Sequence, residues 1–187
     1  MTTFSSSAVR RVLASALIVT TLVIPGIVPK AGAAAATPAC NGLAATIVAA
    51  PGAASVRGTQ GDDVIVGLAG DVRIDGRGGN DTICAGPGDN IINGGAGDDW
   101  ISAGDGANTV DTGAGTNTVY AGSGDDVIIG NFGDDTAYGG EGHNLVSLAG
   151  GNDVLVTGSG NDRLDGAKGF DTCDAGGGSN YVGHCEA

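Results

Sequence analysis

The chain has few basic residues, and their scarcity excludes one large class of partners. Only 8 Lys and Arg residues stand against 21 Asp and Glu residues, which gives a formal net charge of −13 at pH 7. A chain without residues 1–33 would keep five basic residues and all 21 acids, a net charge of −16. Proteins that bind nucleic acid need a basic face that neutralises phosphates. The sequence therefore predicts no nucleic acid partner.

Histidine is also scarce, and the sequence offers no convincing catalytic set. Of the two histidines, His143 lies in a glycine-rich loop and His184 lies near the C-terminus. Carboxylate pairs such as Asp62-Asp63 and Asp98-Asp99 could suggest glycosidase chemistry. These pairs recur in phase with a sequence repeat, however, and the Ser, Thr and Cys residues lack a placed base. We therefore expect that the protein is not an enzyme.

One long apolar run, residues 12–28, lies near the N-terminus. The pair Arg10-Arg11 precedes it, and a stretch of small residues with cleavage sites near Ala33 or Ala35 follows it. This order predicts a secretory signal peptide over residues 1–33 and an extracellular protein. The alternative is an uncleaved anchor, since about 18 apolar residues can span a bilayer. Two prolines and a glycine interrupt the end of the run and favour cleavage, after which no membrane span remains.

Glycine and aspartate are abundant, and they follow a nine-residue repeat. From Gly58 to Gly183 the unit occurs fourteen times in succession without an insertion or deletion. The fullest copy, residues 94–102, has glycine at positions one, two and four, Asp at six and an apolar residue at eight. The acids are 19 Asp and only 2 Glu, and the Asp residues recur in phase in the glycine loops. This phase indicates a role as ligands rather than a merely solvated surface.

The unit resembles the nonapeptide repeat of RTX proteins, the hemolysin-type calcium-binding family, over about two thirds of the chain. The resemblance implies an all-β fold, a right-handed parallel β-roll (β-solenoid) with two sheets of short strands. Each repeat gives a loop and a strand, two repeats complete an 18-residue turn, and residues 58–183 give about seven turns. Position eight points inward. Residues 34–57 form an N-terminal cap, in which Ile47 and Val56 continue the phase, and residues 184–187 form a C-terminal tail.

In RTX rolls, calcium ions lie between stacked loops and are held by loop carbonyls and the Asp at position six, so that metal binding contributes folding energy. The resemblance therefore implies several bound Ca²⁺ ions here. We number the repeats from Gly58 and expect the odd repeats to form the strong edge, with Asn117 as its weak point. The even repeats contain asparagines that can stack as an amide ladder without an ion. The candidate ligands are Asp63, Asp81, Asp99, Asp135, Asp153 and Asp171 on the odd edge, and Asp126 and Asp162, which are weaker, on the even edge.

Four cysteines, all beyond residue 33, indicate an oxidising compartment and a disulfide framework. Three pairings exist, and we favour Cys40 with Cys84 and Cys173 with Cys185, because the two open ends of a solenoid need caps. Free buried thiols are the alternative. If Cys40 stayed in phase it would lie two turns from Cys84, about 10 Å away and beyond the reach of a disulfide. The chain before Thr46 must therefore leave the winding and fold back.

The leading interpretation is a stand-alone secreted calcium-binding protein. The outward positions of the odd strands carry Trp100, Tyr120 and Tyr138, so an adhesion or carbohydrate-binding module for a cell-surface glycan or protein is the alternative. Ice binding is a further alternative, because Asn108-Thr109 and Asn117-Thr118 resemble short ice-binding rows. A measurement of thermal hysteresis would decide that question.

Overall fold

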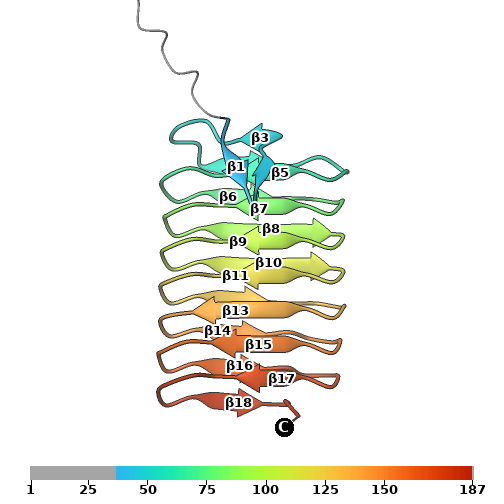
Figure 1. Ribbon diagram of the computed structural model, residues 1–187, viewed down its shortest axis with the longest axis vertical. Helices are drawn as coiled ribbons and strands as arrows, with labels where there is room; N and C mark the ends of the chain where they lie inside the picture. Colours follow the sequence, from blue (N-terminus) through green and yellow to red (C-terminus); the bar gives the residue numbers. More distant parts are fainter. Residues whose placement is uncertain (1–36, 187) are drawn as a thin grey trace, which may run out of the picture. The chain divides into compact units, whose positions relative to one another are not determined.

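The computed structural model describes residues 37–186, and every regular element in that range is a β-strand. Sixteen strands form two eight-stranded sheets, stacked turn upon turn (Figure 1). The odd sheet contains β3 (Ile47–Val48), β5 (Val64–Val66), β7 (Thr82–Cys84), β9 (Trp100–Ser102), β11 (Thr118–Tyr120), β13 (Thr136–Gly140), β15 (Val154–Thr157) and β17 (Thr172–Asp174). The even sheet contains β4 (Ser55–Arg57), β6 (Arg73–Asp75), β8 (Ile91–Ala96), β10 (Thr109–Ala114), β12 (Val127–Ile129), β14 (Leu145–Ser147), β16 (Arg163–Asp165) and β18 (Tyr181–Gly183).

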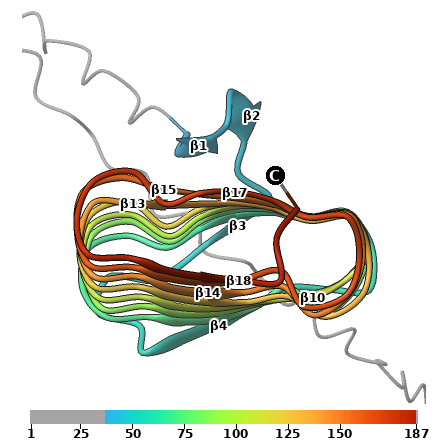
Figure 2. The same cartoon turned by 90° about the horizontal axis from the view of Figure 1, so that it is seen from below.

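Each strand in these sheets pairs in parallel with the strand one turn away, at a spacing of 18 residues. Position eight meets position eight, as in the pairs Ile65 with Ile83 and Ile83 with Ile101. The winding already begins before Gly58, because β3 pairs with β5 and β4 pairs with β6. The predicted all-β solenoid is therefore confirmed, with about eight turns in place of about seven. Viewed along the stack, successive turns superimpose (Figure 2).

The core is a single file of apolar side chains between the two sheets. Position eight is fully or almost fully buried from Ile65 to Leu164, and it contributes one large side chain from nearly every repeat. The loops can stack as closely as the strands because glycine occupies the positions where the backbones of neighbouring turns come into contact. Gly97 has φ of 127°, and a methyl group on it would lie 2.3 Å from the carbonyl oxygen of Gly79 in the preceding turn. Only glycine fits this position without moving the loop.

Both predicted disulfides are present, and no cysteine is free. Cys40 lies on a short antiparallel hairpin, β1 (Ala39–Cys40) and β2 (Leu43–Ala44), and bonds to Cys84 on β7 with a Cα–Cα distance of 5.7 Å. The hairpin lies outside the winding, beside the odd sheet (Figure 2). The expectation that the chain folds back before Thr46 is therefore confirmed. Cys173 bonds to Cys185 at the other end, with a Cα–Cα distance of 5.9 Å.

The predicted signal peptide, residues 1–33, lies outside the described residues. Within residues 37–186 the structure has no helix long and apolar enough to cross a membrane.

Candidate metal-binding edges

The side chains at position six are buried where the loops stack at the two edges of the roll. We call these stacks the odd edge and the even edge, after the repeats that supply their loops. Carboxylates are rarely buried without a partner, because loss of hydration is costly. The buried polar residues at position six are Asp63, Asp81, Asp99, Asn117, Asp135, Asp153 and Asp171 on the odd edge, and Asn90, Asn108, Asp126, Asn144 and Asp162 on the even edge.

One oxygen of each of these side chains has a structural role that is the same for Asp and Asn. The backbone N–H of position six donates a hydrogen bond to Oδ1 of position six in the following turn. Asp81 N–H donates to Asp99 Oδ1 at 2.8 Å, and Asp99 N–H donates to Asn117 Oδ1 at 2.9 Å. On the even edge Asn108 N–H donates to Asp126 Oδ1 at 2.8 Å. These bonds connect neighbouring turns at both edges, whichever of the two residues is present.

The second polar atom distinguishes Asn from Asp. Asn90 Nδ2 donates to the carbonyl oxygens of Gly86 and Gly88 in its own loop, each at 2.9 Å, and of Ala103 in the next turn at 3.0 Å. The amide of Asn108 has the same three kinds of partner. The loop therefore surrounds this atom with acceptors. By the repeat symmetry, an Asp at this position directs Oδ2, another acceptor, at the same carbonyl oxygens.

Six of these Asp residues bury an Oδ2 atom that has no hydrogen-bond partner. An acceptor among acceptors is unfavourable unless a proton or a cation lies between them. Ca²⁺ takes six to eight oxygen ligands from carboxylates and backbone carbonyls, so the donor set fits this ion. No group of three or more His, Cys, Asp or Glu side chains suited to a metal occurs in residues 37–186, and the carbonyl oxygens are therefore essential. The six residues are Asp81, Asp99, Asp126, Asp153, Asp162 and Asp171.

Position one of the repeat provides space for an ion on the odd edge. A methyl group on Gly94 would lie 2.5 Å from Asp99 Oδ2 and 2.4 Å from the carbonyl oxygen of Thr112. A methyl group on Gly76 would lie equally close to Asp81 Oδ2 and the carbonyl oxygen of Gly94. Two acceptor oxygens thus converge on a space that only glycine leaves free. On the even edge this space is taken by buried methyl groups at position one, from Ala85, Ala103 and Ala121.

Sequence reasoning missed this difference at position one, although the signal is present in the sequence. Glycine occupies position one in five of the seven odd repeats, and alanine occupies it in four of the seven even repeats. The consensus of the repeat has glycine at position one, without a distinction between odd and even repeats. Sorting the repeats by parity reveals the enrichment of glycine at position one on the edge that is rich in Asp.

Two of the predicted odd-edge ligands, Asp63 and Asp135, have partners within the protein. Asp63 Oδ2 accepts hydrogen bonds from the Thr59 N–H at 2.7 Å and the Thr59 hydroxyl at 2.9 Å. Asp135 Oδ2 accepts one from the Thr112 hydroxyl at 3.4 Å. A methyl group on Gly130 would lie 2.8 Å from both Asp135 Oδ2 and Leu148 Cδ2, so an apolar side chain fills that gap. These two carboxylates have less need of a cation than the other four.

Burial also changes the acidity of these carboxylates. Burial, together with the smaller effect of the neighbouring charges of Asp99 and Asp63, raises the pKa of Asp81 to about 7 against the opposing effect of the Asp63 N–H bond. Burial likewise raises the pKa of Asp99 and of Asp153 to about 6. The pKa of Asp126 and that of Asp135 are raised by burial as well. Asp81, Asp99 and Asp153 therefore take up protons in the range of about pH 6 to 7 that these values define.

Stacked 18-residue turns with buried carboxylates at both edges define a parallel β-roll whose edges carry the kind of oxygen donors that hard cations prefer. The family model of the RTX calcium-binding nonapeptide repeat matches four times, at residues 57–92, 85–119, 111–146 and 147–182. The chain belongs to this family, and the predicted resemblance is confirmed. Membership implies that the protein binds calcium. A comparison with curated proteins gave no match.

Proposed function

We propose that the protein is a secreted calcium-binding roll in which Ca²⁺ completes the folded structure. The observation that carries the proposal is the set of six buried Oδ2 atoms without partners. An ion at such an atom would be held by the carboxylate and by carbonyl oxygens of positions two and four of the same loop and position one of the next turn. Its charge would offset the repulsion between acceptors. Secretion is supported by the signal-peptide pattern of residues 1–33 and by the two disulfides.

We assign the tighter sites to the odd edge. Asp81, Asp99 and Asp171 combine an unpartnered Oδ2 with glycine at position one of their own repeat. The other odd-edge members are weaker, because threonine hydroxyls already contact Asp63 and Asp135, and Leu148 occupies position one beside Asp153. On the even edge, position one of the same repeat is Ala121 beside Asp126 and Thr157 beside Asp162. Their side chains restrict the space for an ion. Asn117 interrupts the odd edge, since its amide donates to the Gly115 carbonyl oxygen at 3.1 Å and brings no charge.

A pair of Asp→Asn variants tests this assignment. Asp99→Asn keeps the Oδ1 acceptor and replaces Oδ2 with an amide that can donate to the loop carbonyls, as Asn90 does. In equilibrium dialysis we expect Asp99→Asn to lose at least one bound Ca²⁺ ion. Asp126→Asn should lose fewer bound ions than Asp99→Asn at the same calcium concentration. Without calcium we expect the opposite effect for Asp99→Asn, a gain of about 1–3 kcal/mol in stability, because a buried unsatisfied acceptor is removed. Equal ion losses in the two variants would contradict the odd-edge assignment.

We propose no reaction for the protein, since each member of the carboxylate pairs has a separate backbone partner. Asp98 is exposed, and its Oδ1 accepts the Thr116 N–H at 2.8 Å, whereas Asp99 is buried and its Oδ1 accepts the Asp81 N–H at the same distance. Position five and position six therefore form two parallel ladders along the edge. Neither ladder directs two carboxylates at one point in solvent, as glycoside hydrolysis requires.

Adhesion through the aromatic face of the odd sheet is the second candidate. Its outward side chains from β9 to β13 are all uncharged in a strongly acidic protein: Trp100, Ser102, Thr118, Tyr120, Thr136 and Tyr138. The rings, however, stack on one another along the roll. Tyr120 and Tyr138 have ring centroids 4.8 Å apart and an interplanar angle of 8°, so each covers a face that a sugar would need.

A Trp100→Ala variant tests this second candidate. Trp100 ends the aromatic row, at 5.6 Å from the Tyr120 centroid, and it is the ring best placed to offer a face to a ligand. If adhesion is a function, a glycan array probed with the wild-type protein should give a signal that falls at least tenfold in Trp100→Ala. The Tyr181→Ala variant is the matched control, since Tyr181 is an exposed aromatic residue on the even sheet. An array without signal for the wild type would rule against glycan binding.

A further inference from the structure

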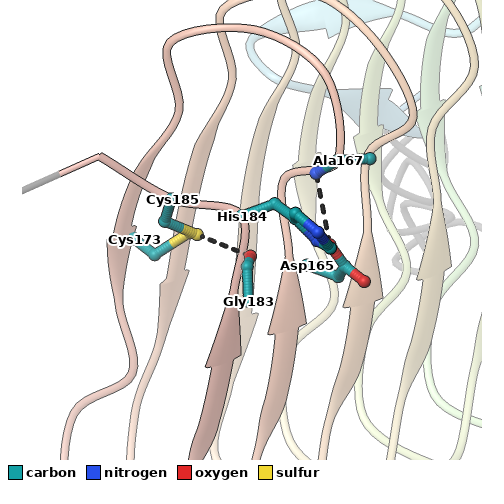
Figure 3. Close-up of polar contacts among 6 residues, drawn as sticks. All are labelled: Asp165, Ala167, Cys173, Gly183, His184 and Cys185. Carbon is teal, nitrogen blue, oxygen red and sulfur yellow. Dashed lines mark hydrogen bonds and ion pairs between the residues drawn. A yellow bond between two sulfur atoms is a disulfide. The ribbon is translucent and has the colours of Figure 1, made fainter.

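The C-terminal tail, residues 184–186, crosses from the even sheet to the odd sheet at the end of the winding. His184 Nδ1 lies 2.8 Å from Asp165 Oδ1 on β16, and Cys185 is bonded to Cys173 on β17 (Figure 3). Beyond the disulfide, the Glu186 N–H donates to the Asp171 carbonyl oxygen at 2.8 Å. Three attachments thus hold three successive residues of the tail against the last turn.

Glu186 reproduces the hydrogen bonds of a missing repeat. In the turn before, Asp153 N–H donates to Asp171 Oδ1, and Asp153 carbonyl oxygen accepts the Thr172 N–H, both at 2.8 Å. Asp171 has no following repeat to complete this pattern. Instead its N–H donates to Glu186 Oε2 at 2.5 Å, and its carbonyl oxygen accepts the Glu186 N–H. A single residue outside the repeats therefore supplies both partners that a fifteenth repeat would provide.

The carboxylate of Asp171 has an unfilled second atom at the same place. Asp171 is 1% exposed, and its Oδ2 is buried without a hydrogen-bond partner. A methyl group on Gly166 would lie 2.5 Å from this oxygen, so glycine at position one leaves the same free space as at Gly76 and Gly94. The usual opposite wall of this space is the next loop. No repeat follows here, and the Glu186 carboxylate of the tail accepts the Asp171 N–H on the side where the next turn would lie.

We infer that Asp171 and Glu186 form a terminal calcium site, closed by the Cys173–Cys185 disulfide. This inference rests on the proposed function, and it adds Glu186 as a second carboxylate to the site already assigned to Asp171. The ion there would have two negative charges beside it, whereas Asn117 brings no charge to its neighbouring sites. The disulfide holds the neighbouring Glu186 against the last odd loop, so the site needs no loop from a further repeat. The last turn is thus sealed by an ion as well as by a covalent bond.

The variant Glu186→Gln tests the terminal site in the full processed chain. Glutamine keeps an oxygen that can accept the Asp171 N–H but removes the charge that would hold Ca²⁺. We expect the number of Ca²⁺ ions bound at saturation in equilibrium dialysis to fall by one, and the circular dichroism spectrum in excess chelator to match that of the wild type. Asp174→Asn is the matched control, because Asp174 is an exposed carboxylate on β17 whose Oδ1 accepts only the local Gly176 N–H. It should bind as many ions as the wild type.

A second pair of variants tests the role of the disulfide. Replacing both Cys173 and Cys185 with Ala should remove the same ion, and adding Glu186→Gln to that variant should remove no further ion, since the two changes act on one site. Replacing Cys40 and Cys84 with Ala should leave the number of ions unchanged. If Glu186→Gln binds as many ions as the wild type, Glu186 is only a hydrogen-bonding cap and the inference is overturned. If the wild type binds no calcium, the proposed function fails together with it.

Discussion

Removal of calcium is expected to unfold most of the roll. In a processed chain treated with excess chelator, the far-ultraviolet circular dichroism signal of β-sheet should largely disappear at 25 °C and pH 7.5. One site at a free ion concentration of 100 times its Kd stabilises the folded state by about 2.7 kcal/mol. Three odd-edge sites of this kind, at Asp81, Asp99 and Asp171, would together contribute about 8 kcal/mol by the same relation. That is comparable to the whole stability of an ordinary domain, about 5–15 kcal/mol.

The physical reason is that the apolar core is thin and the acidic edges repel. Each repeat buries essentially one large apolar side chain at position eight, and six of the seven loops of the odd edge bury a carboxylate. Magnesium is the appropriate control ion, because it demands octahedral geometry and gives up its water reluctantly. It should restore much less of the β-sheet signal than calcium at the same concentration. A chain that gives the same spectrum with calcium and with chelator would refute metal-coupled folding.

The nine-residue repeat and its resemblance to RTX repeats predict most of the fold. The resemblance implies two parallel sheets, and the phase of position eight then sets their register, as between Ile83 and Ile101. The disulfides also followed from the winding, because a solenoid has two open ends and only one pairing staples each of them. The position of the β1–β2 hairpin beside the odd sheet did not follow. It depends on where the chain leaves the repeat, and residues 39–44 carry no repeat signal.

The candidate site was predicted only in part, for a similar reason. The sequence shows directly that Asp predominates at position six of the odd repeats and Asn at position six of the even repeats. It does not show which carboxylate oxygens lack hydrogen-bond partners, because this depends on nearby side chains that are not part of the repeat consensus. Thr59 and Thr112 each place a hydroxyl on a carboxylate of the odd edge, and a threonine in the sequence does not reveal the direction of its hydroxyl. Glu186 lies outside the repeat altogether. Its role depends on the tail folding back onto β17, and sequence spacing gives no indication of that contact.

The pH dependence of folding is expected to change sign when calcium is added. Without calcium, burial raises the pKa of Asp81 from 3.8 to about 7 and the pKa of Asp99 and Asp153 from 3.8 to about 6. The folded state therefore binds more protons than the unfolded state between about pH 4 and pH 7. Under proton linkage, this stabilisation is fully present below pH 4 and is lost as the pH rises through the folded-state pKa values. The metal-free chain should regain β-sheet signal between pH 7.5 and pH 5.

With calcium bound, the same carboxylates must release their protons to hold the ion, so calcium affinity and stability should rise with pH over the same range. Thermal unfolding midpoints measured from pH 5 to pH 8 should therefore rise with pH in saturating calcium. In buffer stripped of metal, the β-sheet circular dichroism signal at 25 °C should instead fall as the pH rises over this range, because deprotonation of the buried carboxylates opposes folding. The double variant Asp81→Asn and Asp99→Asn removes two of the three carboxylates with the largest pKa increases, and it should flatten both curves. Parallel curves for the wild type with and without calcium would show that protons and calcium do not compete for the same buried oxygens. The unpartnered Oδ2 atoms would then need another explanation.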